Sequence, residues 1–168
     1  MNYINQMTLK FDSLSINESF ARSAVAGFCV QLNPTLDEIT DIKTAISEAV
    51  TNCVVHAYPD EIGKIEIWVG LTENTAYISV KDFGVGIVDL ERAREPFYTT
   101  KPNEERAGMG FTVMESFMDS LELLNNKGGG TIVNMSKKIT KKMMARLGEN
   151  GWWKFGTNQT CKTRRWWC

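Results

Sequence analysis

The sequence has no long apolar run. Across its 168 residues, no stretch of about 18 consecutive apolar residues occurs, and the N-terminus lacks a basic segment followed by an apolar one. We therefore expect neither a membrane span nor a signal peptide, and we expect a cytoplasmic protein. The net charge of −1, from 19 Lys and Arg against 20 Asp and Glu, gives no basic surface for direct nucleic-acid binding and no bulk charge for a membrane surface.

Cysteine and histidine are also scarce. The chain has four cysteines and one histidine, and the cysteines show no paired spacing that would indicate a metal site or a disulfide. Cys29 and Cys53 lie in apolar, helix-like stretches, where small buried thiols are expected. We expect His56 to close the end of a helix, where an imidazole complements exposed backbone carbonyls.

The composition changes near the C-terminus. Residues 146–168 hold four of the five Trp, two of the four Cys, and five basic residues against one acidic residue. Residues 1–145 therefore carry a formal charge of about −5. We predict a folded domain over residues 1–145 and an atypical, disordered extension over residues 146–168, rich in Trp, Cys and basic residues. A partner-binding segment is the alternative for the Trp pairs.

Apolar periodicity predicts the first strand and two helices. Alternation at Met7, Leu9 and Phe11 predicts a strand. Ser15–Glu18 and Thr35–Glu38 each have the S/T-x-x-E spacing of a capping box, so we expect a helix to start at each. The expected apolar stripe of the first helix is Phe20, Ala24, Val25, Phe28 and Leu32, and that of the second is Ile39, Ile42, Ile46, Ala49, Val50 and Cys53.

The remaining pattern completes a mixed fold. We expect the two helices to end before Pro34 and Pro59, because the residue before a proline is pushed out of helical conformation. The elements expected afterwards are a hairpin near 65–80, a loop over 83–108, a helix near 111–118, and strands near 121–124 and 131–136. This order predicts an α+β fold, a two-layer sandwich with helices on one face of a mixed, mostly antiparallel sheet.

One face of the second predicted helix is polar. Glu48, Asn52 and His56 are spaced by four residues and therefore share this face. A solvated surface is the simpler interpretation, although Asn is disfavoured in the middle of a helix. A carboxylate one turn from an amide oxygen also suits phosphoryl transfer, in which one group orients a hydroxyl and the other holds Mg²⁺.

Two glycine-containing strings follow this helix. Asp82-Phe83-Gly84-Val85-Gly86 comes directly after a predicted strand, where the carboxylate is placed to accept from an exocyclic amine and the glycines let backbone approach a ligand. Gly108-Met109-Gly110-Phe111 ends the long loop and opens a helix, whose free N–H groups suit an anion. Each string alone also fits a turn or a helix start without a ligand.

Together and in this order, the three strings resemble the GHKL nucleotide-binding family, whose ATP-binding fold agrees with the predicted sandwich. Residues 47–52 with His56 resemble its N box, Asp82 to Gly86 its first glycine box, and Gly108 to Gly110 its second. Within the family, the chain resembles the anti-sigma F branch over about residues 5–145. The strings that carry this closer resemblance are Asn17–Arg22, Thr99–Pro102, Glu105–Phe111 and Met114–Asp119.

The resemblance to the anti-sigma F branch implies a homodimeric protein-serine kinase that uses ATP and Mg²⁺. Such a kinase holds a sporulation sigma factor of the sigma-F type inactive and phosphorylates an anti-anti-sigma partner on serine. It also implies that the first helix, near Glu18 and Arg22, contacts the sigma factor. The alternatives are a switch kinase of the general stress response (sigma-B type), a non-catalytic ATP-dependent adaptor and, least favoured, an ATP-hydrolysing clamp.

The resemblance further implies a role for individual residues. Glu48 would orient and partly deprotonate the attacking serine hydroxyl, and Asn52 would ligate Mg²⁺. Asp82 and Thr131 would bind the adenine, and Arg106 would neutralise charge on the γ-phosphate. The other expected nucleotide contacts are Gly84, Gly86, Thr100, Lys101, Gly108, Met109, Gly110 and Phe111.

Overall fold

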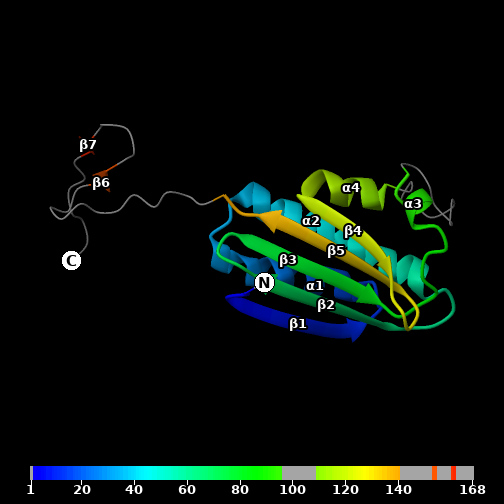
Figure 1. The fold of residues 1–168 in the computed structure, drawn as a ribbon. Helices are drawn as coiled ribbons and strands as arrows, with labels where there is room; N and C mark the ends of the chain where they lie inside the picture. Colours follow the sequence, from blue (N-terminus) through cyan, green and yellow to red (C-terminus); the bar gives the residue numbers. More distant parts are fainter. Residues whose placement is uncertain (1, 96–108, 141–152, 155–159, 162–168) are drawn as a thin grey trace.

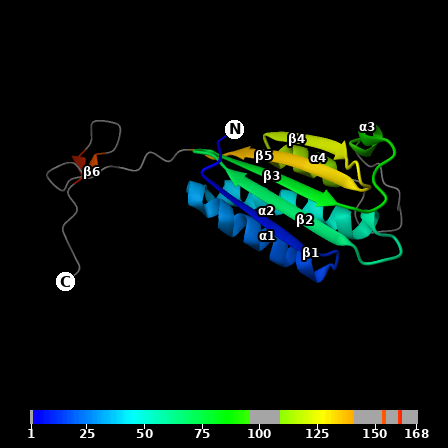
Figure 2. The same ribbon diagram turned by 60° about the horizontal axis from the view of Figure 1, so that its bottom comes forward.

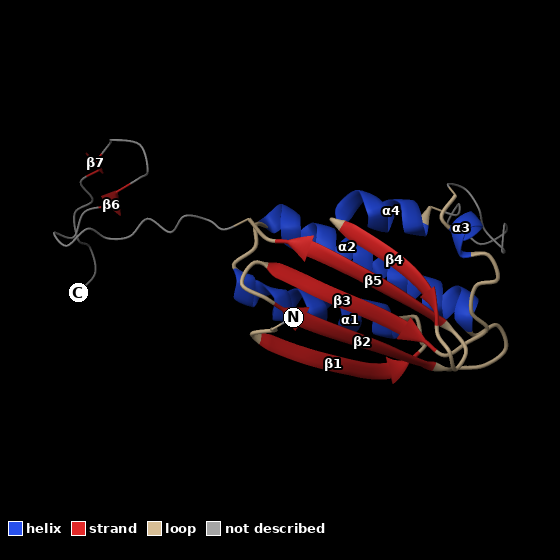
Figure 3. Cartoon of the chain, in the orientation of Figure 1, coloured by secondary structure: helices blue, strands red, loops and turns tan. Residues whose placement is uncertain are grey.

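A five-stranded sheet forms one layer of the fold and helices form the other (Figures 1 and 3). The computed structural model describes residues 2–95, 109–140, 153–154 and 160–161. In spatial order β1-β2-β3-β5-β4, every neighbouring pair of strands is antiparallel, which confirms the predicted sandwich. The strands are β1 (Asn5–Asp12), β2 (Lys64–Leu71), β3 (Thr75–Asp82), β4 (Ser120–Asn125) and β5 (Thr131–Lys138).

The helical layer covers one face of this sheet (Figure 2). Helix α2 packs against α1 on one side and against α4 on the other. The helices are α1 (Ile16–Cys29), the 3₁₀ turn η1 (Val30–Leu32), α2 (Leu36–Asn52), the π-helix η2 (Cys53–Ala57), α3 (Leu90–Ala93) and α4 (Gly110–Phe117). None of the helices in the described residues is both long enough and apolar enough to cross a membrane.

Alternation along the strands produces the core. Ile65, Ile67 and Val69 point from β2 toward the helices and are fully buried, because successive side chains of a strand face opposite sides of the sheet. They join one apolar cluster with the buried side of α2, including Ile42 and Ile46. The core therefore holds α2 against the sheet and fixes the position of its polar face.

The second capping box is confirmed and adds a further tie. The backbone N–H of Thr35 donates to Oε2 of Glu38 at 2.7 Å, and the N–H of Glu38 donates to Oγ1 of Thr35 at 3.1 Å. The backbone N–H of Thr140 donates to Oε1 of Glu38 at 2.8 Å. Burial alone would raise the pKa of Glu38, but the donors at Thr35 and Thr140 outweigh it and lower the pKa to about 2.

The prediction of a capping box at Ser15 and Glu18 is wrong. Ser15 has helical backbone angles and makes no cap hydrogen bond with its side chain, so helical geometry begins one residue too early for the box. The carboxylate of Glu18 instead accepts from the hydroxyl of Ser47 on α2 and from Arg22 at 3.3 Å. The side chain therefore ties α1 to α2. Phe20, expected in the apolar stripe, is 55% exposed. Its ring contacts the ring of Phe11, with 6.4 Å between the two centroids.

The second helix changes type before its end. Helix α2 stops at Asn52, and the last five residues before Tyr58 form the π-helix η2. A π turn is wider than an α turn and is common at functional sites. His56 lies in its last turn, at the helix end where the sequence placed it.

Little of the extension is described. Strand β6 (Trp153–Lys154) pairs antiparallel with β7 (Thr160–Cys161). The other residues of 146–168 lie outside the described residues, so the division of the chain after residue 145 stays a prediction.

Candidate functional site

Glu48 and Asn52 converge on the first residue of α4. A methyl group built on Gly110 would lie 3.1 Å from Oδ1 of Asn52 and 3.3 Å from Oε2 of Glu48. Both polar side chains are half-buried between α2 and α4. The absence of a side chain at Gly110 therefore leaves room for these two groups where the helix begins.

The start of α4 offers backbone donors to the same place. Met109 is the N-cap residue, is 41% exposed and makes no side-chain cap bond, so no side chain of the cap covers the first N–H groups. The aligned peptide dipoles make a helix N-terminus favourable for a phosphate. Phe111 packs against the core and anchors this end of α4. Gly108, the other glycine of this string, lies outside the described residues.

Asp82 forms the second part of the site, at the end of β3. The residue is 3% exposed, and Oδ1 of its carboxylate accepts from the backbone N–H of Gly84 at 3.0 Å. The backbone N–H of Thr131 also donates to it, and the thiol of Cys53 lies 3.9 Å from Oδ2. Burial raises the pKa of Asp82, although these hydrogen bonds oppose the rise.

The glycines near Asp82 are required by the fold itself. A methyl group on Gly84 would lie 1.9 Å from the carbonyl oxygen of Ala57, and one on Gly130 would lie 2.3 Å from the backbone oxygen of Asp82. Gly86 has a φ of +72°, a backbone conformation that favours glycine. The sequence explained Gly84 and Gly86 by the approach of a ligand, but packing against η2 and a left-handed turn already demand them.

Two consecutive residues connect the two parts. Asn52 ends α2 beside Gly110, and Cys53 begins η2 beside Asp82. The structure thus brings together nine predicted site residues in two adjoining groups, Glu48, Asn52, Met109, Gly110 and Phe111, and Asp82, Gly84, Gly86 and Thr131. Thr100, Lys101 and Arg106 fall outside the described residues, so their roles stay predictions.

The donor set fits Mg²⁺ held largely by phosphate. Within the described residues, no group of three His, Cys, Asp or Glu side chains is arranged to hold a metal ion. Mg²⁺ usually takes one or two protein oxygen ligands and completes its shell with water and substrate phosphates. The amide oxygen of Asn52, one turn from Glu48 and beside the helix start at Gly110, has the chemistry of such a ligand.

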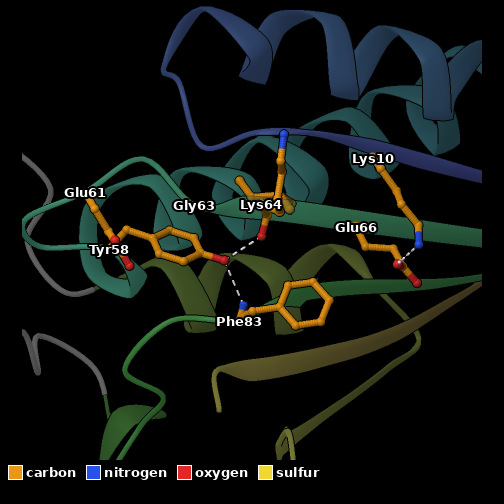
Figure 4. Close-up of a pocket in the computed structure, with 8 residues that line it drawn as sticks. Lys10, Tyr58, Glu61, Gly63, Lys64, Glu66 and Phe83 are labelled. Carbon is orange, nitrogen blue, oxygen red and sulfur yellow. Dashed lines mark hydrogen bonds and ion pairs between the residues drawn. The ribbon is translucent and has the colours of Figure 1, made fainter. Parts of the chain in front are cut away.

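A separate cavity lies at the neighbouring corner of the sheet (Figure 4). Its volume is about 540 Å³, and Lys10, Tyr58, Lys64, Glu66 and Phe83 are among its lining residues. None of the predicted nucleotide contacts that lie within the described residues lines it. The charged ends of Lys10 and Glu66 are already paired at 2.8 Å. This cavity is therefore separate from the two groups of residues around Glu48 and Asp82.

Sequence reasoning missed three residues around Asp82. Cys53 was expected only to be buried, and Tyr58 and Gly130 were not singled out. Cys53 and Asp82 are 29 positions apart, and Tyr58 and Phe83 are 25 apart, so no local spacing could relate them. The proline after Tyr58 marked the end of the helix but carried no sign of the contacts made by the ring.

Comparison with known proteins identifies the family of this chain. A family model described as a histidine kinase-like ATPase domain matches residues 15–137. An anti-sigma F factor of Caldanaerobacter subterraneus subsp. tengcongensis is 57% identical over 139 residues, which is 83% of this chain and 97% of that protein. The chain belongs to the anti-sigma F factor family of histidine kinase-like ATPases. An anti-sigma F factor of Bacillus subtilis is 50% identical over 138 residues, covering 82% of this chain and 94% of that family member.

Solved structures of the wider ATPase family share the fold. The RsbU and RsbW domains of a Mycobacterium tuberculosis protein match with a TM-score of 0.58 and 18% identity, over 80% of this chain and 32% of that one. The catalytic domain of the histidine kinase ThkA matches with a TM-score of 0.52 and 17% identity, over 80% of this chain and 99% of that one. Membership in the family of histidine kinase-like ATPases indicates that this chain binds ATP.

Proposed function

We propose that this chain is an anti-sigma factor and an ATP-dependent protein-serine kinase. It holds a sporulation sigma factor of the sigma-F type and phosphorylates the anti-anti-sigma antagonist of that factor on serine. The observation that carries the kinase activity is the convergence of Glu48 and Asn52 on Gly110 at the start of α4. The names of the relatives favour a sigma-F partner over a sigma factor of the general stress response.

Glu48 is the base in the proposed reaction. Its carboxylate accepts the proton of the attacking serine hydroxyl as the serine oxygen bonds to the γ-phosphorus. The bond from that phosphorus to the oxygen bridging the β- and γ-phosphates breaks, and ADP leaves. Mg²⁺, when bound at Asn52, neutralises charge on the phosphates. The N–H groups at the start of α4 hold the phosphate oxygens while the transfer takes place.

Asp82 selects the base of the nucleotide. Its buried carboxylate accepts from the exocyclic amine of adenine, and Thr131 holds the carboxylate through its backbone N–H. Burial raises the pKa of Asp82, so a donor that approaches its ionised form relieves a cost already present in the empty site. Thr100, Lys101, Arg106 and Gly108 are proposed to contact the phosphates from the connection before α4.

We propose that the chain forms a homodimer and that the face of α1 binds the sigma factor. Glu18 bonds to Ser47 on α2 and pairs with Arg22, whose side chain is 42% exposed. Ser47 directly precedes Glu48 on α2. A partner that engages Arg22 therefore lies close to the residue that accepts the serine proton.

The mass of the complexes tests this function. The chain, a sigma-F-type factor and Mg·ATP should form one complex in equilibrium sedimentation, with two copies of the chain. Addition of the antagonist should release the sigma factor and produce phosphoserine on the antagonist. Failure to bind the sigma factor with either ATP or ADP would contradict the anti-sigma role. Release without phosphoserine would indicate a non-catalytic adaptor instead.

A further inference from the structure

The hydroxyl of Tyr58 joins β2 and β3 where their direct pairing stops (Figure 4). Ile65 pairs with Asp82, so Lys64 and Phe83 would form the next pair of this antiparallel ladder. Instead, the backbone N–H of Phe83 donates to Oη of Tyr58 at 2.8 Å, and Oη donates to the carbonyl oxygen of Lys64. One side-chain hydroxyl therefore stands between the strands as they separate.

The end of η2 also holds the residues that follow. The backbone N–H of Val85 donates to the carbonyl oxygen of Ala57 at 3.0 Å, the same oxygen against which Gly84 packs. Tyr58 is 9% exposed, and its ring occupies the space that a side chain on Gly63 would need. Residues 83–85 are thus fixed by two neighbouring residues of one helix end.

Those three residues aim the carboxylate of Asp82. Oδ1 of Asp82 accepts from the backbone N–H of Gly84, which lies between the two amides held by Tyr58 and Ala57. A peptide held on both sides has little freedom to turn its N–H away. The direction of the Asp82 carboxylate therefore depends on the hydrogen bonds one residue to either side of Gly84.

We propose that Tyr58 is a positioning residue for recognition of the adenine amine. Its hydroxyl fixes Phe83 and thereby the Gly84 amide that orients Asp82. This inference rests on the proposed contact between Asp82 and adenine. Tyr58 touches no reacting atom, and Glu48 and Asn52 lie on α2, outside its hydrogen bonds. It therefore affects nucleotide affinity and base selectivity, and leaves the transfer step unchanged when the site is saturated.

Base selectivity gives the test. The dissociation constants of ATP and of purine riboside triphosphate, which lacks the 6-amino group, are measured for the wild type and for Tyr58→Phe. The wild type should prefer ATP by roughly 10–100-fold, since one hydrogen bond to a buried charged group is at stake. Tyr58→Phe should reduce this preference by about tenfold and raise KM for ATP, with kcat within about twofold.

Tyr77→Phe is the matched control. It deletes a tyrosine hydroxyl from β3, the strand that ends at Asp82, five residues before that carboxylate, and should leave the preference for ATP unchanged. An unchanged preference in Tyr58→Phe, in a protein that binds ATP and discriminates against the analogue, would overturn the inference alone. A wild type that binds no ATP would overturn the proposed function as well, and a wild type that binds both nucleotides equally would overturn the base contact at Asp82.

Hydrogen exchange in the wild type provides a measurement that needs no variant. If Tyr58 and Asp82 are coupled, binding of the amine must stabilise the bond between Phe83 and Tyr58 by the same free energy, because coupling is reciprocal. Saturation with ATP should slow exchange of the Phe83 amide about tenfold more than saturation with the analogue. Equal exchange rates with the two nucleotides would contradict the inference, even if Tyr58→Phe does not fold.

Discussion

The thiol sulfur of Cys53 lies 3.9 Å from Oδ2 of Asp82, and both side chains are buried. Burial and the neighbouring charge of Asp82 raise the pKa of Cys53, so the thiol stays protonated and acts as a weak donor. Because Cys53 directly follows Asn52, a single peptide bond connects the proposed phosphate side of the site to its proposed base side. At this change from α to π geometry, Asn52 lies beside Gly110 and Cys53 lies beside Asp82.

Asp82→Asn should weaken the binding of ATP and stabilise the fold. Burial raises the pKa of Asp82, so its ionised form costs free energy in the folded chain at pH 7, and this cost is absent when the pH is low enough to protonate it. A neutral amide removes the cost, and we expect a free energy of unfolding higher by about 1 kcal/mol. The affinity for ATP should fall by roughly 10–100-fold, because the amide presents donors toward the adenine amine. Urea unfolding and calorimetric titration measure the two effects.

The stability and the ATP affinity of Asp82→Asn are expected to change in opposite directions, which makes this test specific. A general structural defect would lower stability and affinity together. Asp82→Asn that loses stability but keeps ATP affinity would contradict both the electrostatic cost and the assignment of Asp82 to the base.

The charge of Glu38 should stabilise the fold near neutral pH, and this stabilisation should be lost in acid. The pKa of Glu38 is about 2 in the fold and about 4.5 when unfolded, so its contribution is complete above pH 4.5 and is lost as the pH falls toward 2. We expect Glu38→Gln to lower the free energy of unfolding by about 2–3 kcal/mol at pH 7. The difference from the wild type should shrink steadily below pH 4.5. A difference that is constant from pH 7 to pH 3 would show that the charge of Glu38 is not responsible.

Thr35 and Ser15, the residues before α2 and α1, provide a matched pair of alanine variants. Thr35→Ala removes an observed cap bond and should cost about 1 kcal/mol. Ser15→Ala removes a hydroxyl that makes no cap bond and should cost less than about 0.5 kcal/mol. Thermal unfolding of both variants at pH 7 compares them. Equal losses would mean that Ser15 caps α1 in solution after all.

Gly110→Ala should impair phosphoryl transfer. The added methyl group would lie 3.1 Å from Asn52 and 3.3 Å from Glu48, tighter than ordinary contact, so at least one of the two polar groups must move. The required movement is a few tenths of an ångström. Because a displacement of about 1 Å can cost roughly 10²-fold in rate, we expect kcat to fall by a smaller factor, roughly tenfold. Initial rates of antagonist phosphorylation at saturating ATP provide the measurement.

Gly27→Ala is the control for that substitution. A methyl group on Gly27 would meet nothing within 4 Å, and the residue lies inside α1. Its replacement should raise the free energy of unfolding by about 0.5–1 kcal/mol and leave kcat unchanged. Similar losses of kcat in both variants would point to an effect on folding rather than on Glu48 and Asn52.

Removal of residues 146–168 should leave the domain intact. Among the described residues, the last member of the apolar core is Ile139, and the bond from Thr140 to Glu38 is retained in the shortened chain. Affinity for ATP and the rate of phosphorylation should stay within about twofold of the full chain. A tenfold loss of either quantity would make the extension part of the kinase.

Local pattern was enough for the five strands of the sheet and for helices α1, α2 and α4, but not for α3, which lies in the stretch predicted as a loop over 83–108. Alternation at Ile65, Ile67 and Val69 predicted β2 because each strand buries every second side chain, and the spacing of Thr35 and Glu38 predicted the start of α2. The same spacing failed at Ser15, where Glu18 is used by a residue of another helix. A short pattern cannot show such a competing partner.

The site was predictable only in part, and for the same reason. Glu48 and Asn52 share a face by their spacing, which the helix alone dictates. The contacts of Cys53 and Tyr58 with the end of β3 depend on how η2 is laid against the sheet, and that follows from the packing of the whole core. Only the complete fold therefore reveals the residues that support Asp82.

A single-turnover transfer assay tests the role of Glu48 most directly. The chain is mixed with Mg²⁺, ATP labelled in the γ-phosphate and the purified anti-anti-sigma partner, and labelled phosphoserine is followed in time for the wild type and for Glu48→Gln. We predict labelled phosphoserine with the wild type, a rate lower by at least about 10²-fold with Glu48→Gln, and ATP affinities within about twofold of each other. A folded wild type that binds ATP but yields no phosphoserine, or a Glu48→Gln variant that transfers phosphate at the wild-type rate, would contradict the account.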